Sequence, residues 1–257
     1  MSFQKMQQID GGYYIISKKP FSPSNHSFKD GTVKTVFEFA YDMTFGEKGE
    51  HRDHRSGGSY NRHKGEIFAN TFQGKLAECA VCNLFYKKDS TVKPDFSTYE
   101  LGKWDSVDIV VNNKKISIKS TKAIGNLLLL ETKDWDNQGR YLPNVEGNDP
   151  RSGIYDYTIM VRIDPACEEK FLHSGVLYDD KCEKTVLEEI VYSKEWKYDY
   201  AGYITYDDLR MIITSGNYII RESDLLNGTT RMDADNYYVQ AGDMRDCTEL
   251  VEQIYGK

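Results

Sequence analysis

The sequence predicts a mixed α/β or α+β fold around a central sheet, because helix, hairpin, strand, strand and helix patterns follow one another along the chain. Apolar residues recur every four positions over residues 66–86, which is close to the spacing of an amphipathic helix. Residues 108–119 read as two short strands joined by an asparagine pair. Two further strand patterns, 155–164 and 201–206, lead into a helical pattern over 207–213.

The composition is that of a globular protein, which could form one large domain or a core with an appended subdomain, and we predict a single domain spanning residues 1–257. The 257 residues are 39% hydrophobic and 13% aromatic, with six prolines, no low-complexity run and no repeat at a solenoid period. A chain of this length can bury a substantial core. The net charge of −7 argues weakly against a nucleic-acid partner, because DNA responds to a local basic surface rather than to the total charge. Enzymes that hold divalent metal also concentrate carboxylates.

The cysteines and the N-terminus predict a cytoplasmic protein. An odd number of cysteines, widely spread in a long chain, is typical of reduced thiols in the cytosol. The first residues contain no apolar core of signal-peptide length, and no segment approaches the length of a membrane span. We therefore expect no membrane partner. The five cysteines are Cys79, Cys82, Cys167, Cys182 and Cys247.

The N-terminal stretch, residues 1–65, is predicted to contain a short strand over 12–17 and a loop around 20–28. The segment 33–41 that follows is mixed in character. Residues 46–65 are polar and rich in glycine, which predicts a long exposed loop. Loops of that length are usually functional or disordered.

A helix is expected from Glu66 to about Tyr86, although Gly74 could split it in two. Beyond the hairpin, the apolar run 126–131 could be a strand or a helix, and 236–240 could be a closing strand or an ordered tail. The apolar positions of the helix are Phe68, Phe72, Leu76, Ala80 and Leu84.

The hairpin places an acidic and a basic side chain on one face of the sheet. Asn112 and Asn113 tolerate the positive φ angles of a two-residue turn. If they form the loop, Asp108 lies opposite Ser117, and Lys119 follows two residues later on the same face. Burial in the core explains the apolar residues of the opposite face. The polar residues of this face need a chemical explanation. The apolar face carries Val107, Ile109, Val111, Ile116 and Ile118.

Metal-assisted phosphodiester chemistry is the best explanation for the polar face. A hard cation prefers oxygen ligands, and a nearby ammonium stabilises negative charge that grows in the transition state. The alternative is an exposed hairpin with an ordinary Asp–Lys pair, which contributes little. Asp95 and Asp105 are rivals to Asp108, but one lies too far before the hairpin and the other just before its first strand. We expect both rivals to be loop or helix-cap residues.

Residues 66–135 resemble the PD-(D/E)xK nuclease superfamily, and within it most closely a Type II restriction endonuclease. The resemblance consists of three segments in the superfamily's order: 74–78, 104–111 and 116–121. It implies a restriction-endonuclease-like core, in which a central mixed sheet carries the active-site hairpin at its centre and helices flank the sheet. It also implies that residues 136–257 supply the rest of the sheet and the elements for DNA recognition and dimerisation.

The resemblance assigns catalytic roles to residues of the hairpin. Asp108 matches the aspartate that binds Mg²⁺, and the backbone carbonyl of Ile118 would join it as a ligand. Lys119 matches the lysine that orients or activates the attacking water and offsets charge on the phosphorane.

Ser117 departs from the superfamily's pattern, which has a second carboxylate at this position. A branch of restriction enzymes carries serine there and recruits a glutamate from elsewhere in the chain. The candidates are Glu78 on the upstream helix and Glu131, which lies twelve residues beyond Lys119. The family-like helix position slightly favours Glu78.

The polar loop 46–65 is where cationic residues concentrate in this acidic chain. Arginine suits phosphates and guanine edges, asparagine suits adenine, and glycines permit a close approach of the backbone. We interpret the loop as a DNA-contacting arm, and the alternative is a solvated surface loop. The predicted DNA-binding residues are Arg52, Arg55, Tyr60, Asn61, Arg62 and Lys64.

Other cofactors receive little support from the sequence. His51 with His54, or Cys79 with Cys82, could each supply two zinc ligands, but cysteines on a helix are more often packing residues. The chain has no P-loop and no glycine pattern for binding a dinucleotide, so we expect no nucleotide cofactor.

The expected function is that of a Type II restriction endonuclease in a restriction-modification system, which hydrolyses double-stranded DNA at a short recognition sequence with Mg²⁺. Such enzymes are usually homodimers, since a two-fold protein matches a palindromic site. One alternative is another nuclease of the superfamily, such as a junction resolvase or a repair nuclease. A second alternative is a DNA-binding or scaffold protein without catalysis.

Overall fold

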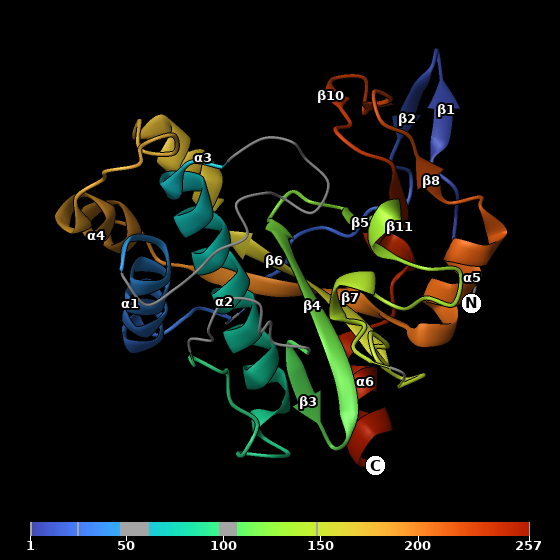
Figure 1. Cartoon of the computed structure of the whole chain (residues 1–257), viewed down its shortest axis with the longest axis horizontal. Coiled ribbons are helices and arrows are strands. Elements are labelled where there is room, and N and C mark those ends of the chain that lie inside the picture. Colours follow the sequence, from blue (N-terminus) through green and yellow to red (C-terminus); the bar gives the residue numbers. More distant parts are fainter. Residues whose placement is uncertain (1, 25, 47–61, 98–106, 148, 257) are drawn as a thin grey trace.

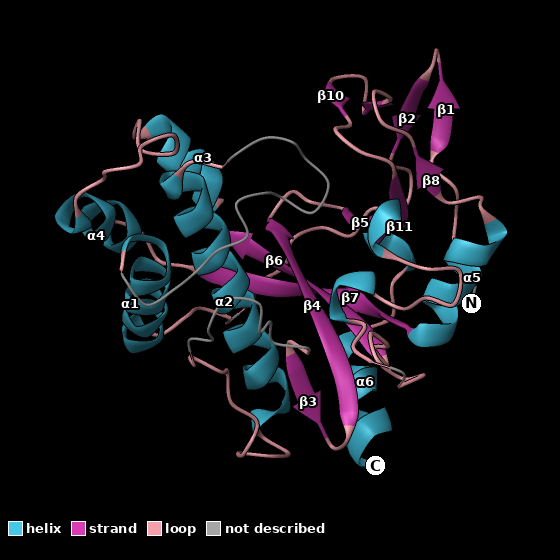
Figure 2. Cartoon of the chain, in the orientation of Figure 1, coloured by secondary structure: helices cyan, strands magenta, loops and turns pink. Residues whose placement is uncertain are grey.

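The computed structural model describes residues 2–24, 26–46, 62–97, 107–147 and 149–256, which form helices and three sheets (Figures 1 and 2). The sheet that contains the hairpin is mixed, because β4 pairs antiparallel with β3 and parallel with β6, and β6 pairs antiparallel with β7. The predicted mixed α/β class is therefore confirmed. In order across the sheet, its strands are β3 (Ile109–Val111), β4 (Lys114–Lys122), β6 (Tyr157–Asp164) and β7 (Lys197–Thr205).

The β3–β4 hairpin has the predicted register. Ile109 lies opposite Ile116 and Val111 lies opposite Lys114. The two turn residues have φ angles of 47° and 62°, in the left-handed region that asparagine tolerates. The local sequence therefore determines which side chains share a face.

The place of the hairpin within the sheet differs from the expectation. We expected it at the centre, but in the described part of the chain β3 is an outer strand of the four. The second neighbour of β4 is β6, a parallel strand reached only after a long connection. The hairpin sequence does not determine that pairing. The sheet continues beyond β4, through β6 and β7, and β3 remains at its edge.

Helices cover one face of this sheet. Helix α2 (Lys64–Tyr86) lies along the apolar face of the hairpin, as Figure 2 shows, and buries Phe72 and Leu76 completely. The segment 33–41 lies within a helix. The other helices that contribute side chains to the same core are α1 (Asp30–Phe45), α3 (Cys167–His173), α4 (Lys184–Tyr192) and α6 (Cys247–Tyr255).

Helix α2 differs from the expectation at two points. It passes Gly74 without a break, because the space beside this residue is open and nothing forces a bend. It also begins at Lys64, because His63 caps it and the Glu66 side chain accepts a hydrogen bond from the His63 N–H at 2.8 Å. Lys64 therefore belongs to the first helical turn and not to the loop.

The opposite face of the sheet packs against a second sheet and helix α5 (Tyr206–Ser215). Met160 and Ile204 of the first sheet meet Leu128 and Leu130 of the second in one core. The ambiguous segments 126–131 and 236–240 both contain strands. In order, the second sheet consists of β5 (Leu127–Glu131), β11 (Asn236–Gln240) and β8 (Ile219–Ile220).

A third, smaller sheet projects from the body of the protein at the upper right of Figure 1. Its strands, in order, are β1 (Gln7–Ile9), β2 (Gly12–Tyr14), β9 (Leu225–Leu226) and β10 (Thr230–Arg231). The N-terminal segment thus pairs with a late part of the chain, through the parallel contact of β2 with β9.

The cysteines lie within the cores rather than at the surface. All five are buried and unbridged. Cys79 and Cys82 pack between α2 and the first sheet, as expected for packing residues. Within the described ranges, none of the helices has the length and apolar character needed to cross a membrane.

Candidate active site

The structure brings the predicted hairpin residues together. The pairing of β3 with β4, continued by one residue, places Asp108 opposite Ser117 on the face turned away from α2. The Ile118 N–H donates a hydrogen bond to Asp108 Oδ2 at 2.6 Å, which fixes the carboxylate against β4. Ser117, two residues before Lys119 on the same strand, is buried. An acid just before β3 and an amine on β4 therefore share one face of the hairpin, and Asp108 does not line the pocket that holds Lys119.

Lys119 points into a pocket of about 330 Å³ at the junction of the first and second sheets. Its Nζ lies 5.3 Å from the centre of the Tyr141 ring, close enough for a cation–π contact. Within the described part of the chain, Lys119 forms no ion pair. Three carboxylates also line the pocket, those of Glu131, Asp134 and Asp233, so a phosphate could enter only together with a bound cation. The other lining residues are Leu129, Leu130, Glu131, Asp134, Trp135, Met232, Asp233 and Asn236.

Glu131 shares this pocket and ends strand β5. Its Oε2 atom is buried without a hydrogen-bond partner, and Lys133 Nζ is 3.7 Å away, beyond hydrogen-bonding distance. Burial, together with the charges of Asp134 and Asp233, raises the pKa of Glu131, and Lys133 offsets this only in part. A buried carboxylate oxygen without a donor is the kind of group that a cation would satisfy.

Glu78 occupies a different environment. It forms an ion pair with Lys75 one helical turn earlier, at 2.5 Å between Oε2 and Nζ. Lys75 also donates a hydrogen bond to the Asp95 backbone oxygen at 2.7 Å and lies over the ring of Phe39 in α1. Helix α2 packs on the sheet face opposite to Lys119. Of the two candidate glutamates, Glu131 is the one that shares a pocket with the lysine.

The remaining predicted residues are divided between described and undescribed parts of the chain. Lys64 is exposed at the start of α2, where its N–H donates to Asp180 at 2.9 Å, and Arg62 lies just before the cap. Asp95 is a loop residue, as expected, and its Oδ1 accepts from the Ser97 N–H at 2.8 Å. The predicted residues that lie outside the described ranges are His51, Arg52, His54, Arg55, Tyr60, Asn61 and Asp105.

The oxygen donors of the site fit a hard divalent cation. Mg²⁺ is usually held by one or two carboxylates, with waters and substrate phosphates completing the shell. Asp108 against β4 and Glu131 in the Lys119 pocket are the two candidate carboxylates, and the Oε2 atom of Glu131 pairs with Lys133 without a hydrogen bond. No cluster of three or more His, Cys, Asp or Glu side chains suited to a metal occurs in the described ranges. Burial raises the pKa of the Cys79 and Cys82 thiols to about 12, and both side chains pack in the core.

The pocket contains two residues that the sequence pattern did not suggest, Tyr141 and Asp233. Both come from connections between elements, and neither belongs to a periodic segment or a motif. Glu131 became a candidate because it lies twelve residues beyond Lys119, at the end of an apolar run that could have been a strand or a helix.

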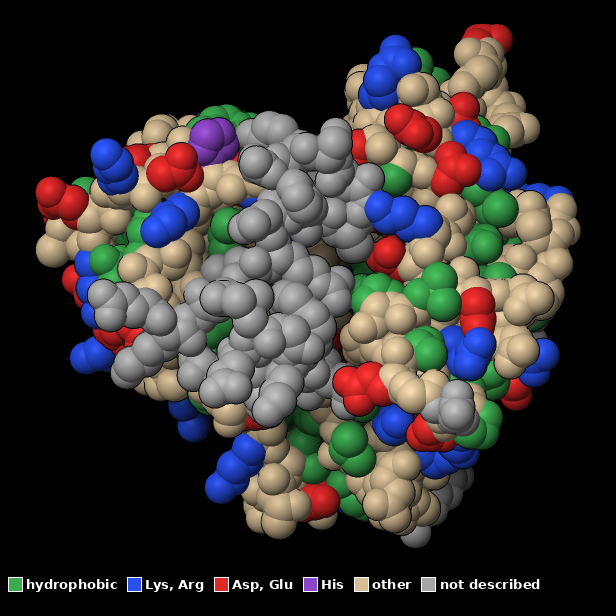
Figure 3. Space-filling view, viewed as in Figure 1, with side chains coloured by type: hydrophobic (Ala, Val, Ile, Leu, Met, Phe, Trp, Pro, Cys, Tyr) green, Lys and Arg blue, Asp and Glu red, His purple; other side chains and the backbone are tan. Residues whose placement is uncertain are grey.

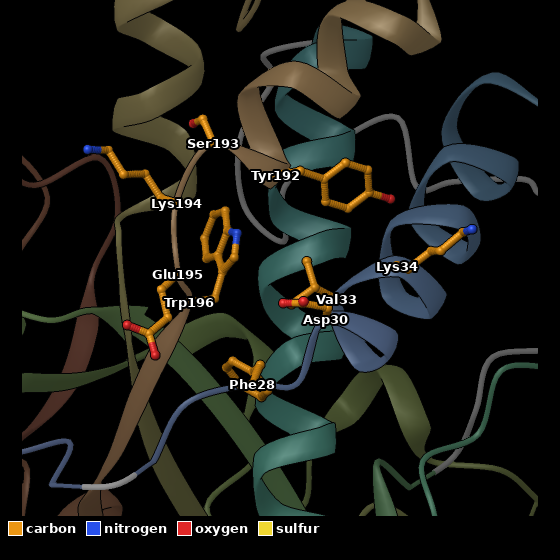
Figure 4. A pocket seen from close by; sticks show the side chains of 9 residues that line it. All are labelled: Phe28, Asp30, Val33, Lys34, Tyr192, Ser193, Lys194, Glu195 and Trp196. Carbon is orange, nitrogen blue, oxygen red and sulfur yellow. The ribbon is translucent and has the colours of Figure 1, made fainter.

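A separate pocket of about 520 Å³ lies between the start of α1 and the connection from α4 to β7. Figure 4 shows Trp196 and Tyr192 on one side of it and Asp30, Val33 and Lys34 on the other. None of the predicted site residues lines this pocket. On the face seen in Figure 3, the described basic and acidic side chains are interspersed, so DNA binding would depend on local contacts.

The raised pKa of Glu131 predicts a cost in stability. We expect the Glu131→Gln variant to unfold at a higher temperature than the wild-type protein at pH 7, and to lose this advantage below about pH 4, where glutamates are protonated. The folded state binds the Glu131 proton more tightly than the unfolded state does, so stability falls as pH rises through the folded-state pKa. Thermal unfolding at several pH values measures this, with exposed Glu252→Gln as the control. A wild-type protein that is the more stable of the two at pH 7 would contradict it.

Comparison with known proteins finds no matching family model, no matching curated protein and no matching solved structure.

Proposed function

We propose that the protein is a Mg²⁺-dependent endonuclease that hydrolyses duplex DNA at specific sequences, as a Type II restriction enzyme does. The observation that carries the proposal is the grouping of Asp108 and Lys119 on one sheet face, with the buried carboxylate of Glu131 in the same pocket as the lysine. One acid in the pocket of the lysine and a second acid held against the same strand are the kinds of group that metal-assisted phosphodiester hydrolysis needs.

The residues divide the chemistry between them. Asp108, Glu131 and the Ile118 carbonyl would hold Mg²⁺, which supplies Lewis-acid stabilisation of the phosphate when bound. Lys119 would orient the attacking water and offset the negative charge that grows as the water oxygen bonds to phosphorus and the leaving oxygen departs. Ser117 is buried on the same strand and supplies no anionic ligand.

A homodimer acting on double-stranded DNA follows from the same proposal. Cleavage of both strands at a palindrome needs two copies of the Lys119 pocket related by a two-fold axis. We propose that the protein is cytoplasmic. A companion methyltransferase would form a restriction-modification system together with this nuclease.

The proposal is tested by incubating the purified protein with phage DNA and Mg²⁺. Discrete fragments that disappear with EDTA would support it. A smear of products would indicate a nuclease without sequence specificity, and intact DNA would indicate a DNA-binding protein without catalysis. Mg²⁺ should also raise the unfolding temperature of the wild-type protein, because it binds the folded state, but not that of Glu131→Gln.

Two glutamine variants distinguish the candidate glutamates. Glu131→Gln should reduce cleavage by at least about 10²-fold. Altering a residue that only contacts a metal ligand already costs about 10- to 100-fold, and Glu131 is proposed as a ligand itself. Glu78→Gln keeps the helix and removes one partly buried ion pair on the sheet face opposite to Lys119, so we expect cleavage within about threefold of wild type. The reverse order of effects would place the second metal-binding carboxylate on α2.

A further inference from the structure

A second pocket opens on the other face of strand β4, next to the proposed active site. Successive residues of a strand point to opposite faces, so Lys119 points to one side and Ser120 to the other. The pocket has a volume of about 370 Å³ and lies between β4, α2 and α3. Its lining residues are Asn70, Gln73, Ser120, Thr121, Lys122, Ala166, Glu168, Glu169 and Leu172.

The lining of this pocket suits uncharged hydrogen-bonding groups better than phosphate. Its lysine, Lys122, already forms an ion pair with Glu169 at 2.7 Å, and Glu168 adds a second carboxylate. Negative charge of this kind repels a phosphate group. Amides and hydroxyls supply donors and acceptors without charge, as the edges of DNA bases do.

Asn70 is the amide in this pocket that is free to bind a ligand. Asn70 and Gln73 are one turn apart on α2, so both face β4. Gln73 Nε2 is 3.4 Å from Ser120 Oγ, a weak hydrogen bond that occupies one amide. The half-buried carboxamide of Asn70 makes no hydrogen bond with any residue in the described ranges.

We propose that this pocket reads base edges of the DNA that the protein cleaves, and that Asn70 determines specificity for an adenine. An asparagine carboxamide donates to adenine N7 and accepts from adenine N6, a pairing that no other base edge in the major groove matches equally well. The proposal rests on the proposed function. It places the base-reading amide in a pocket lined by Ser120, whose Cα is about 3.8 Å from that of Lys119 along the strand.

The test compares Asn70→Ala with wild type on a library of randomised duplexes, with sequencing of the cleaved ends. We expect the adenine preference at one position of the recognition sequence to fall by about 5- to 150-fold, the range for one bidentate contact. Preferences at the other positions should persist. Asn70→Asp keeps an acceptor but loses the donor, so it should shift that position towards cytosine, which offers an N4 donor.

Asn83→Ala is the control, because Asn83 is an exposed amide of the same helix more than three turns from Asn70, and its Nδ2 donates a hydrogen bond to Tyr198 at 3.2 Å. It should cut the wild-type sequence with unchanged preference. Identical specificity of Asn70→Ala and wild type would overturn the assignment of Asn70 while leaving the nuclease proposal intact.

If the wild-type protein cuts nothing, the same library is selected by binding with Ca²⁺. Sequence-independent binding by wild type then overturns the inference, and an adenine preference that Asn70→Ala loses supports it.

Discussion

Replacing Lys119 with alanine should reduce DNA cleavage by at least about 10³-fold, with folding unchanged and DNA binding largely retained. The ammonium lies in the pocket with Glu131, over the ring of Tyr141, and forms no ion pair in the described ranges. Its removal therefore exposes no buried partner charge. The loss falls on the transition state, in which the charge on the phosphoryl oxygens grows.

The measurement is single-turnover cleavage of a supercoiled plasmid, together with thermal unfolding and DNA binding in Ca²⁺. Lys114→Ala is the control, because Lys114 begins the same strand and forms a partly exposed ion pair with Asp156 at 3.2 Å. Pairs of that kind contribute little, so this variant should cleave at the wild-type rate. Wild-type cleavage by Lys119→Ala would remove the lysine from the mechanism. Equal losses in both variants would show a general effect of charge on DNA binding.

The hairpin could be predicted because its determinants are local. An asparagine pair sets the turn, and the alternation of apolar residues on both sides sets the register. Asp108, Ser117 and Lys119 therefore share a face for reasons that lie within a dozen residues of sequence. The edge position of β3 could not be derived in this way, because it depends on the pairing of β4 with β6 across a long connection.

The choice between Glu78 and Glu131 depended on packing that the sequence does not display. Strand β5, which carries Glu131, is positioned by antiparallel pairing with β11 more than one hundred residues later. Helix α2 is apolar around most of its circumference, so its period did not show which side Glu78 would occupy. The sequence indicates Glu78 and Glu131 as candidates, and the tertiary structure places Glu131 in the same pocket as Lys119.

Replacing Arg162 with methionine should destabilise the protein by about 3–5 kcal/mol, the usual cost of breaking a buried ion pair from one side. Arg162 lies on β6, next to the active-site strand, and is completely buried. Its guanidinium donates two hydrogen bonds to Asp199 on β7, at 2.8 and 2.5 Å. Two further hydrogen bonds reach the backbone oxygens of Lys19 and Pro20 and fasten the N-terminal segment across the sheet.

The expected fall in unfolding temperature is about 10 °C for a chain of this size, measured by calorimetry or circular dichroism. In the methionine variant Asp199 stays buried and loses the guanidinium. Within the described residues, the Ser22 N–H at 2.7 Å is then its remaining hydrogen-bond donor. The double variant Arg162→Met with Asp199→Leu removes both charges and should recover much of the loss. Arg221→Met is the control, because Arg221 pairs with Asp235 at the surface and its loss should have a much smaller effect. Equal effects of the two arginine substitutions would mean that burial does not determine the contribution of the Arg162 ion pair to stability.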